Sequence, residues 1–366
     1  MRRLKLLHFA DLHLDAPFTS LGDAGVAETR RQELRLAFRR IVETARTEAV
    51  DLLLAAGDLF EHDYAGKSAI TLLQDGFESL GATPVVIVPG NHDPLMPGSQ
   101  YYSPGWPANV HILKDSGEKL ELGAQGAVVY SGVPDSAMDE SLINILLLHG
   151  TLDMNIGKRV YNPVASAELD ALGADYAALG HFHTPLKGAG RRGRIFNPGS
   201  PEPLGFDEEG THGIFVCALE KEDGISRVDA KFLPVNRRSY VKLSVRLEEC
   251  ATDERAAEAA VRAFEAGRAD DLYEITFTGT TAAGFRLNRN HAAALVKEKV
   301  YYARIKDETV PAYDLAAIRK EPGLRGLFAD RLLDRAAKAA GGGERELIMQ
   351  ALYFGLEAID YGEISI

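Results

Sequence analysis

The chain has 366 residues, of which 46% are hydrophobic and 26% are charged, and its formal net charge is −12. This length suffices for one large domain and a smaller one, because a single hydrophobic core stops growing at about 250–300 residues. The negative charge argues against a protein coated in positive charge for nucleic acid, although it leaves room for a local basic groove.

Membrane and disulfide-rich classes fit the sequence poorly. No apolar run reaches the roughly 18 residues that a membrane helix needs. The short apolar stretch near the N-terminus is broken at His8 and Asp11 and is followed by no small-residue cleavage pattern. The two cysteines, Cys217 and Cys250, lie far apart, which argues against a disulfide framework. We therefore expect a cytoplasmic protein without membrane association.

Up to about residue 235, short apolar runs alternate with polar loops and helical stretches. Runs that are apolar at most positions are typical of strands buried on both faces. They cover residues 4–9, 51–56, 84–88, 127–132, 143–148, 175–179, 213–219 and 228–233. Helical spacing of apolar residues marks 28–49 and 68–80. Strands alternating with helices predict a layered α/β domain.

The pattern changes at residue 237. Strands at 239–247, 272–278 and 300–305 and helices at 253–266 and 290–299 predict a small α+β unit, and helices follow at 313–320, 323–340 and 344–361. We therefore predict an α/β domain at 1–236, an α+β domain at 237–310 and a helical segment at 311–366. The apolar stripe of the last helix (Ile348, Leu352, Leu356 and Ile359) packs either on the protein's own core, which we favour, or on a partner.

Metal-ligand residue types follow five of the predicted strands. They are Asp11 and His13, then Asp58, then Asn91 with His92 and Asp93, then His149, and finally His181 and His183. The C-terminal strand ends of an α/β sheet meet at one crevice, where ligands bind. Each motif alone is explained by a turn or a buried histidine. Five of the ten histidines, however, share this placement, which favours a metal site.

The ligand types indicate the metals. Imidazole, carboxylate and one amide oxygen, without thiolate, suit Mn²⁺, Fe or Zn²⁺. Seven ligands exceed what a single ion takes from side chains, whereas two ions that share a carboxylate would use them all. Such pairs act on phosphate esters as Lewis acids and hydroxide generators. We therefore predict two divalent ions, with Mn²⁺ favoured.

The ordered motifs Asp11-x-His13, Gly57-Asp58, Gly90-Asn91-His92-Asp93, His149-Gly150 and Gly180-His181-x-His183 resemble the calcineurin-like metallophosphoesterase superfamily. The resemblance covers about residues 1–235. It implies a four-layer αββα sandwich. It implies one ion held by Asp11, His13, Asp58 and His183, and another held by Asp58, Asn91, His149 and His181. His92, oriented by Asp93, would be the general acid, and a bridging hydroxide would attack the phosphorus.

The flanks of the motifs are similar to a narrower group, the bacterial DNA repair exonuclease family and its SbcD/YhaO-like branch. Residues 7–18 and Gly57-Asp58-Leu59-Phe60 carry this resemblance. It implies DNA as substrate, a cap formed by the α+β domain, and C-terminal helices that dock an SMC-like coiled-coil ATPase. A homodimer contact through the helices at 28–49 and 68–80 also follows from the resemblance, although ordinary layer packing explains those helices as well.

One position departs from the related nucleases. Archaeal and eukaryotic relatives carry a histidine three residues after the bridging aspartate, where this chain has Glu61 followed by His62. Exonuclease action is therefore less firmly implied than phosphodiester cleavage. Our first hypothesis is a metal-dependent DNA repair exonuclease, and the alternative is a phosphodiesterase or phosphatase for a nucleotide or another small phosphoester. A scaffold with a decayed metal site would lack ligands, and every ligand is present.

Overall fold

The computed structural model describes residues 1–366 except 115–116, 135–136, 154–159, 265–267 and 363–366. The chain forms two compact units, Met1–Tyr240 and Val241–Ile366. The predicted three-part division, with boundaries after residues 236 and 310, is finer than these two units and stays a prediction.

The described part of the first unit contains two six-stranded sheets. The first sheet has the order β12-β11-β1-β2-β3-β4. Neighbours from β1 to β4 run parallel, and β11 pairs antiparallel with β1. Its strands are β1 (Arg2–Phe9), β2 (Leu52–Ala56), β3 (Val85–Val88), β4 (Val110–Ile112), β11 (Gly213–Glu222) and β12 (Ile225–Pro234).

The second sheet has the order β5-β6-β7-β8-β10-β9, in which β6, β7, β8 and β10 run parallel. Its strands are β5 (Lys119–Leu122), β6 (Ala127–Ser131), β7 (Ile143–His149), β8 (Tyr176–Gly180), β9 (Leu186–Ala189) and β10 (Ile195–Asn197). The two sheets face each other across one core, in which Leu54 and Val86 of the first sheet join Leu147 and Tyr176 of the second.

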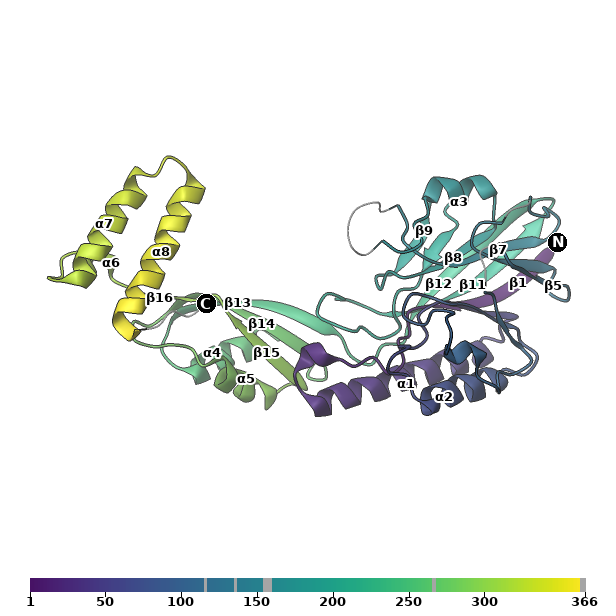
Figure 1. Ribbon diagram of the computed structural model, residues 1–366, viewed down its shortest axis with the longest axis horizontal. Helices are drawn as coiled ribbons and strands as arrows, with labels where there is room; N and C mark the ends of the chain where they lie inside the picture. The colour runs from purple at the N-terminus through teal and green to yellow at the C-terminus, as the bar shows by residue number, and fades with distance from the viewer. Residues whose placement is uncertain (115–116, 135–136, 154–159, 265–267, 363–366) are drawn as a thin grey trace. The chain divides into compact units, whose positions relative to one another are not determined.

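Helices cover the outer faces of both sheets (Figure 1). Helices α1 (Ala24–Thr47) and α2 (Lys67–Glu78) lie on the first sheet, and α3 (Ser166–Leu172) lies on the second. Leu169 of α3 packs into a cluster with Leu146 and Ala177 of the second sheet. The predicted four-layer αββα sandwich is therefore confirmed. Two short 3₁₀ turns, Thr19–Leu21 and Gln100–Tyr102, lie in its loops.

Helix α1 begins earlier than its apolar pattern predicts. The side chain of Asp23 accepts hydrogen bonds from the backbone N–H groups of Gly25 and Val26, which have no partner inside the helix. The helix buries Leu34 and Phe38 on its inner stripe, and Phe38 packs edge-to-face on Phe77 of α2, with ring centroids 5.3 Å apart.

The second unit contains the predicted α+β element. Its described strands are β13 (Tyr240–Cys250), β14 (Leu272–Thr281), β15 (Tyr302–Asp307) and β16 (Val310–Pro311), and its first helices are α4 (Asp253–Arg262) and α5 (Arg289–Lys297). Strands β15 and β16 both run parallel to β14. Ala260 of α4 and Val296 of α5 pack against Ile275 and Phe277 in its core.

Three helices follow β16 in the described residues: α6 (Leu315–Ile318), α7 (Leu324–Lys338) and α8 (Gly342–Tyr361). Leu352 and Leu356 of α8 are buried in a cluster with Ile318 and Ala329, so most of the predicted stripe packs on the chain itself. Ile359 is 37% exposed. Among the described helices, none combines the length and apolar character needed to cross a membrane.

Candidate metal centre

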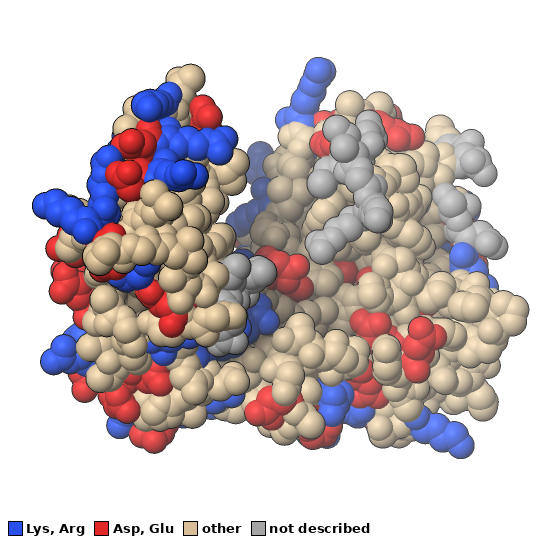
Figure 2. All heavy atoms as spheres, turned by 60° about the vertical axis from the view of Figure 1, so that its left-hand side comes forward, with Lys and Arg blue, Asp and Glu red and all other residues tan. Residues whose placement is uncertain are grey.

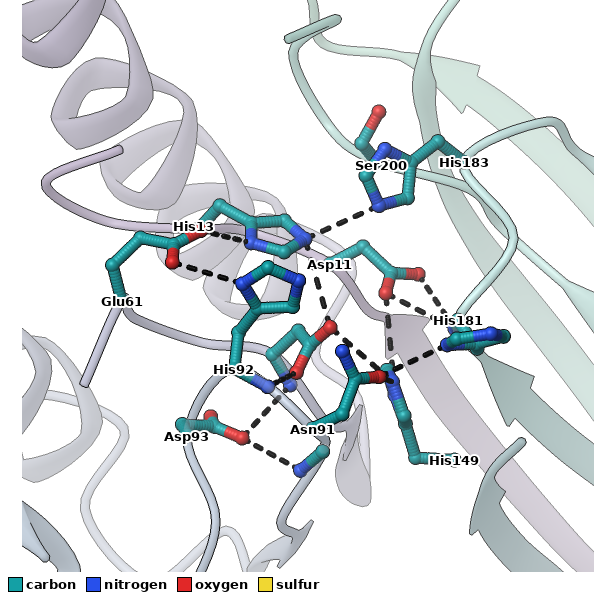
Figure 3. A network of polar contacts seen from close by, with 12 residues as sticks. Asp11, His13, Glu61, Asn91, His92, Asp93, His149, His181, His183 and Ser200 are labelled. Atoms are coloured by element: carbon teal, nitrogen blue, oxygen red, sulfur yellow. Dashed lines mark hydrogen bonds and ion pairs between the residues drawn. The ribbon is translucent and has the colours of Figure 1, made fainter. Parts of the chain in front are cut away.

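Seven predicted ligands lie together at the C-terminal strand ends of both sheets, and Figure 3 labels all of them except Asp58. The loops after β1, β2 and β3 carry the ligands from the first sheet, and the end of β7 and the loop after β8 carry those from the second. They are Asp11, His13, Asp58, Asn91, His149, His181 and His183. Backbone hydrogen bonds hold two of the loops in register, because the N–H groups of Asp11 and His13 donate to the carbonyls of Gly57 and Asp58.

The donor atoms of these residues form overlapping groups. The donor atoms of Asp11, His13 and His183 lie within 4.8 Å of one another, and so do those of Asp11, Asp58 and His149. Asp58 reaches towards both sides, with its Oδ2 3.3 Å from His149 Nε2 and 3.7 Å from His13 Nε2. This is the geometry that a shared carboxylate needs between two ions.

Asn91 and His181 complete the second side of the cluster. Asn91 Oδ1 lies 3.1 Å from His149 Nε2 and 3.0 Å from His181 Nδ1. The other ring nitrogen of His149, Nδ1, donates to the backbone oxygen of Ala56 at 2.8 Å, which leaves Nε2 of the neutral ring as an acceptor. That acceptor faces the oxygens of Asn91 and Asp58, and a cation between the three atoms would satisfy them all.

A second pair of acceptors meets at His13 and His183. His13 Nδ1 donates to Glu61 at 2.8 Å, and His183 Nδ1 donates to Glu208 at 2.6 Å. Their Nε2 atoms are therefore lone-pair acceptors in the neutral rings, yet they face each other 3.2 Å apart. Carboxylates that fix the far nitrogen of a histidine are typical of metal-binding imidazoles. The residues present thus fit a divalent metal pair.

The electrostatics of the cluster favour added positive charge. Burial alone lowers the pKa of His183, but its hydrogen bond with Glu208 and the nearby carboxylates outweigh burial and raise the pKa to about 9. His149 behaves in the same way, because the hydrogen bond with Asp58 and the charge of Asp11 raise its pKa to about 9 against the effect of burial. Divalent cations supply this positive charge without protons.

The backbone is bent at the ligands. Asp11, His13, Asp58 and His181 all have positive φ, at 52°, 47°, 54° and 101°. This region is unfavourable for residues with a side chain and is found at functional sites, where the surrounding fold holds it in place. Gly90 permits the close packing, since a Cβ there would lie 2.2 Å from Asp58 Oδ1.

His92 stands beside the cluster, and its side chain is 45% exposed. It lines a cavity of about 630 Å³ with Asp58, Asn91, Tyr161 and His181. His92 Nδ1 hydrogen-bonds Glu61 Oε2 at 2.9 Å, which turns the other ring nitrogen away from that carboxylate. This position suits an acid that protonates a leaving oxygen. His92 also lies close enough to His13 and Asp58 to form a third group of donor atoms.

The structure corrects the partner assigned to His92. Asp93 is fully buried and accepts hydrogen bonds from the backbone N–H groups of Gly90, Asp58 and Leu59 and from Tyr101 Oη. It therefore holds the loop in shape, and Glu61 makes the orienting contact. The side chain of His92 is partly exposed whereas that of Asp93 is fully buried, so the two neighbours in sequence have different hydrogen-bond partners.

Two other carboxylates of the site, Glu61 and Glu208, were absent from the predicted set. Glu208 also accepts from Ser200 Oγ at 3.0 Å and lies in a loop that has no distinctive pattern. His62 belongs to none of the candidate ligand groups among the described residues. Its backbone N–H donates to the carbonyl of His92, and its Nδ1 is buried without a hydrogen-bond partner in the described part of the chain.

Comparisons with known proteins agree with this geometry. The calcineurin-like phosphoesterase family profile matches residues 4–185. The uncharacterized metallophosphoesterase YhaO of Bacillus subtilis is 28% identical over 240 residues, which cover 60% of this chain and 58% of YhaO. The DNA double-strand break repair protein Mre11 of Methanopyrus kandleri is 27% identical over 259 residues, which cover 60% of this chain and 54% of that protein. The chain thus matches little more than half the length of these curated relatives.

Among solved structures, GAP50, the anchor in the inner membrane complex of Plasmodium, is similar with a TM-score of 0.39 and 11% identity, covering 64% of this chain and 85% of that one.

Proposed function

Because the chain belongs to the calcineurin-like phosphoesterase family, we propose that its centre holds two divalent metal ions, Mn²⁺ foremost, and hydrolyses phosphodiester bonds in DNA. The observation that carries the proposal is the convergence of imidazole nitrogens and carboxylate oxygens in overlapping groups, each with its donor atoms within 4.8 Å of one another. When bound, two such ions neutralise the non-bridging phosphate oxygens and generate a hydroxide nucleophile at neutral pH.

The chain's own residues divide the remaining work. Asp11, His13, Asp58 and His183 would hold one ion, and Asp58, Asn91, His149 and His181 the other. The cavity beside them leaves room for a phosphodiester against the cluster. His92, at the rim, would donate its Nε2 proton to the departing sugar oxygen.

Two observations support DNA as the substrate. The first is the similarity to archaeal proteins named for DNA double-strand break repair. The second is a cavity of about 670 Å³, lined by Arg31, Arg35, Arg39 and Tyr64, next to the loop that begins at Glu61. Arg31 and Arg35 pair with acidic neighbours, whereas Arg39 has no ion-pair partner in the described part of the chain. Arginines and an exposed aromatic ring suit a nucleic-acid backbone and its bases.

A small phosphoester remains the second candidate, and the charge distribution favours it. The net charge is −12, and on the face in Figure 2 the Lys and Arg side chains are interspersed with Asp and Glu. Such a surface attracts a long polyanion weakly.

Salt dependence separates the two substrates. We expect log Kd for a short duplex to vary linearly with log salt concentration, and Arg39→Ala to reduce that slope by about 0.9, as expected for one lost phosphate contact. The control is Arg227→Ala, which should leave the slope unchanged. Arg227 is exposed and lies on β12, the edge strand of the first sheet. Fluorescence anisotropy of a labelled duplex, titrated at several salt concentrations, gives Kd and therefore the slope for each variant. A flat dependence for the wild type would contradict DNA as the substrate.

The partners implied by the resemblance also belong to the proposal. An SMC-like coiled-coil ATPase would find exposed apolar side chains on α7 and α8, namely Leu324, Leu327, Leu347 and Phe354. The homodimer contact and the cytoplasmic location stay predictions.

A further inference from the structure

Four charged side chains form a buried ion cluster where the chain leaves the first unit. Arg30 of α1 is fully buried and pairs with Glu33 and with Glu202, whose Oε2 lies 3.1 Å from Arg30 Nη2. Glu33 also accepts from Arg238 Nε at 2.7 Å, and Glu202 accepts from the backbone N–H of Arg237. The ion cluster therefore alternates two cations with two carboxylates.

Tyr240, the last residue of the first unit and the first of β13, packs against this ion cluster. Its buried ring has the guanidinium carbon of Arg30 5.6 Å from its centroid and meets the ring of Phe206 edge-to-face at 4.7 Å. The backbone of Tyr240 pairs with Glu209 in an isolated parallel bridge. Side chain and backbone thus hold residues 237–240, the junction segment, to the loop between β10 and β11.

The loop between β10 and β11 also supports a predicted metal ligand. Glu208 accepts from His183 Nδ1 at 2.6 Å, and its other oxygen accepts from Ser200 Oγ and from the backbone N–H of Leu204. The N–H of Ser200, which lies beside His183 in Figure 3, donates to the carbonyl of His183. Glu202 lies between these contacts in the chain, so the loop that holds the His183 ring is the loop that the ion cluster holds.

The main effect of the ion cluster is geometric. A buried ion pair adds little net stability, because taking its charges out of water costs about as much free energy as their pairing returns. Hydrogen bonds between charged groups are nevertheless short and directional, and they are strongest where water is excluded. Helix α1, the loop between β10 and β11, and the junction segment are therefore fixed to one another at defined positions.

We propose that these residues, which we call the junction clamp (Arg30, Glu33, Glu202, Arg238 and Tyr240), couple the segment that enters the second unit to the metal ligand His183. A displacement of the junction segment moves Glu202, the loop and Glu208, and so shifts the imidazole that one of the two ions would bind. The part of this inference that concerns the ion rests on the proposed function, whereas the clamp belongs to the chain itself.

Coupling between two sites is reciprocal, so a metal ion at the centre must also tighten the junction segment. Hydrogen exchange of the full chain, followed by mass spectrometry, measures this. Mn²⁺ should slow amide exchange in residues 237–240 of the wild type by at least about 5-fold, the lower end of allosteric couplings. Glu202→Gln should lose this protection, because the amide leaves the buried Arg30 guanidinium with one counter-charge fewer.

Two variants of Tyr240 make this result interpretable. Tyr240→Leu removes the aromatic contacts with Arg30 and Phe206 without touching a charge, and it should also lose the protection. It tests the clamp independently if Glu202→Gln does not fold. Tyr240→Phe is the matched control and should keep the protection, because the hydroxyl has no hydrogen-bond partner in the part of the chain that the structure describes.

Titration calorimetry with Mn²⁺ tests the route through Glu208. Glu202→Gln should weaken one of the two binding steps by about 10-fold, the mild end of the range for groups that support a metal ligand, and leave the other step nearly unchanged. Added to Glu208→Gln, it should cause no further loss, because both substitutions act through the same contact with His183. Additive losses would contradict this route.

A second buried ion pair separates coupling from a general loss of stability. Asp175, which precedes β8, lies 2.8 Å from Lys221 Nζ, and both side chains are buried. Asp175→Asn should lower the thermal unfolding midpoint, yet it should change neither the Mn²⁺ affinity nor the protection of residues 237–240. A purely structural role for the junction clamp would make its variants behave like this one.

The clamp and the proposed function fail in different ways. A wild type that binds no Mn²⁺ would refute the proposed function, and the metal-free chain would then test the clamp. In that state Glu202→Gln and Tyr240→Leu should speed amide exchange in residues 200–208, and Asp175→Asn should not. Unchanged exchange there in both clamp variants, or Mn²⁺ protection of residues 237–240 that survives them, would overturn the clamp.

Discussion

Replacing Asp58 by asparagine should abolish the metal pair and reduce phosphodiester hydrolysis by about three orders of magnitude or more, since both the Lewis acid and the source of the nucleophile are lost. Asp58 Oδ2 faces His149 on one side and His13 on the other, so this one carboxylate serves both groups of donor atoms. An amide has a single, uncharged oxygen and cannot replace the bridge.

The substitution should leave the fold intact, which makes the result interpretable. The backbone N–H of His92 donates to Asp58 Oδ1 at 2.7 Å, and an amide oxygen accepts the same hydrogen bond. Metal content by elemental analysis and the thermal unfolding midpoint of the metal-free protein measure the two effects separately. Asp75→Asn, which alters an exposed residue of α2, is the control. A variant of Asp58 that retained two ions per chain would contradict the shared role.

Replacing His92 by alanine should lower kcat by about 100- to 10,000-fold on substrates with an alkoxide leaving group, the range for general acid catalysis, without loss of metal. The His92 side chain is 45% exposed at the cavity rim, so its removal leaves no buried void. Bis-p-nitrophenyl phosphate should be hydrolysed at nearly the wild-type rate, because its leaving group departs unaided.

The metal content of this variant also distinguishes two roles for His92. Its ring nitrogen lies close enough to His13 and Asp58 to complete a third set of candidate ligands. Loss of an ion from His92→Ala would therefore mark the residue as a ligand, and unchanged turnover would remove it from the mechanism altogether. His111→Ala, a partly exposed histidine on β4, is the matched control.

The sequence could place the candidate ligands at strand ends that meet, because buried parallel strands are apolar at nearly every position. Leu52–Ala56 and Ile143–His149 are buried at every position; the predicted ligand Asp58 lies two residues after the first strand, and the predicted ligand His149 ends the second. Strands and helices that lack a buried apolar run of this length were not predicted from the sequence. Strand β4 has three residues, β9 is mostly exposed at the edge of its sheet, and helix α3 has seven residues.

The supporting carboxylates could not be found in the same way. Glu61 lies 48 residues from His13, and Glu208 lies 25 residues from His183, so no periodic pattern connects the pairs. Only the three-dimensional packing of the loops brings them together. Asp93 shows the opposite error, because it neighbours His92 in sequence but is fully buried beneath the loop.

The metal dependence of hydrolysis tests the central claim most directly. Metal-free protein, titrated with Mn²⁺ while bis-p-nitrophenyl phosphate hydrolysis is followed, should show no activity at first and reach a plateau at two equivalents per chain. A plateau at one equivalent, or hydrolysis that proceeds without added metal, would contradict a two-ion centre built on Asp58.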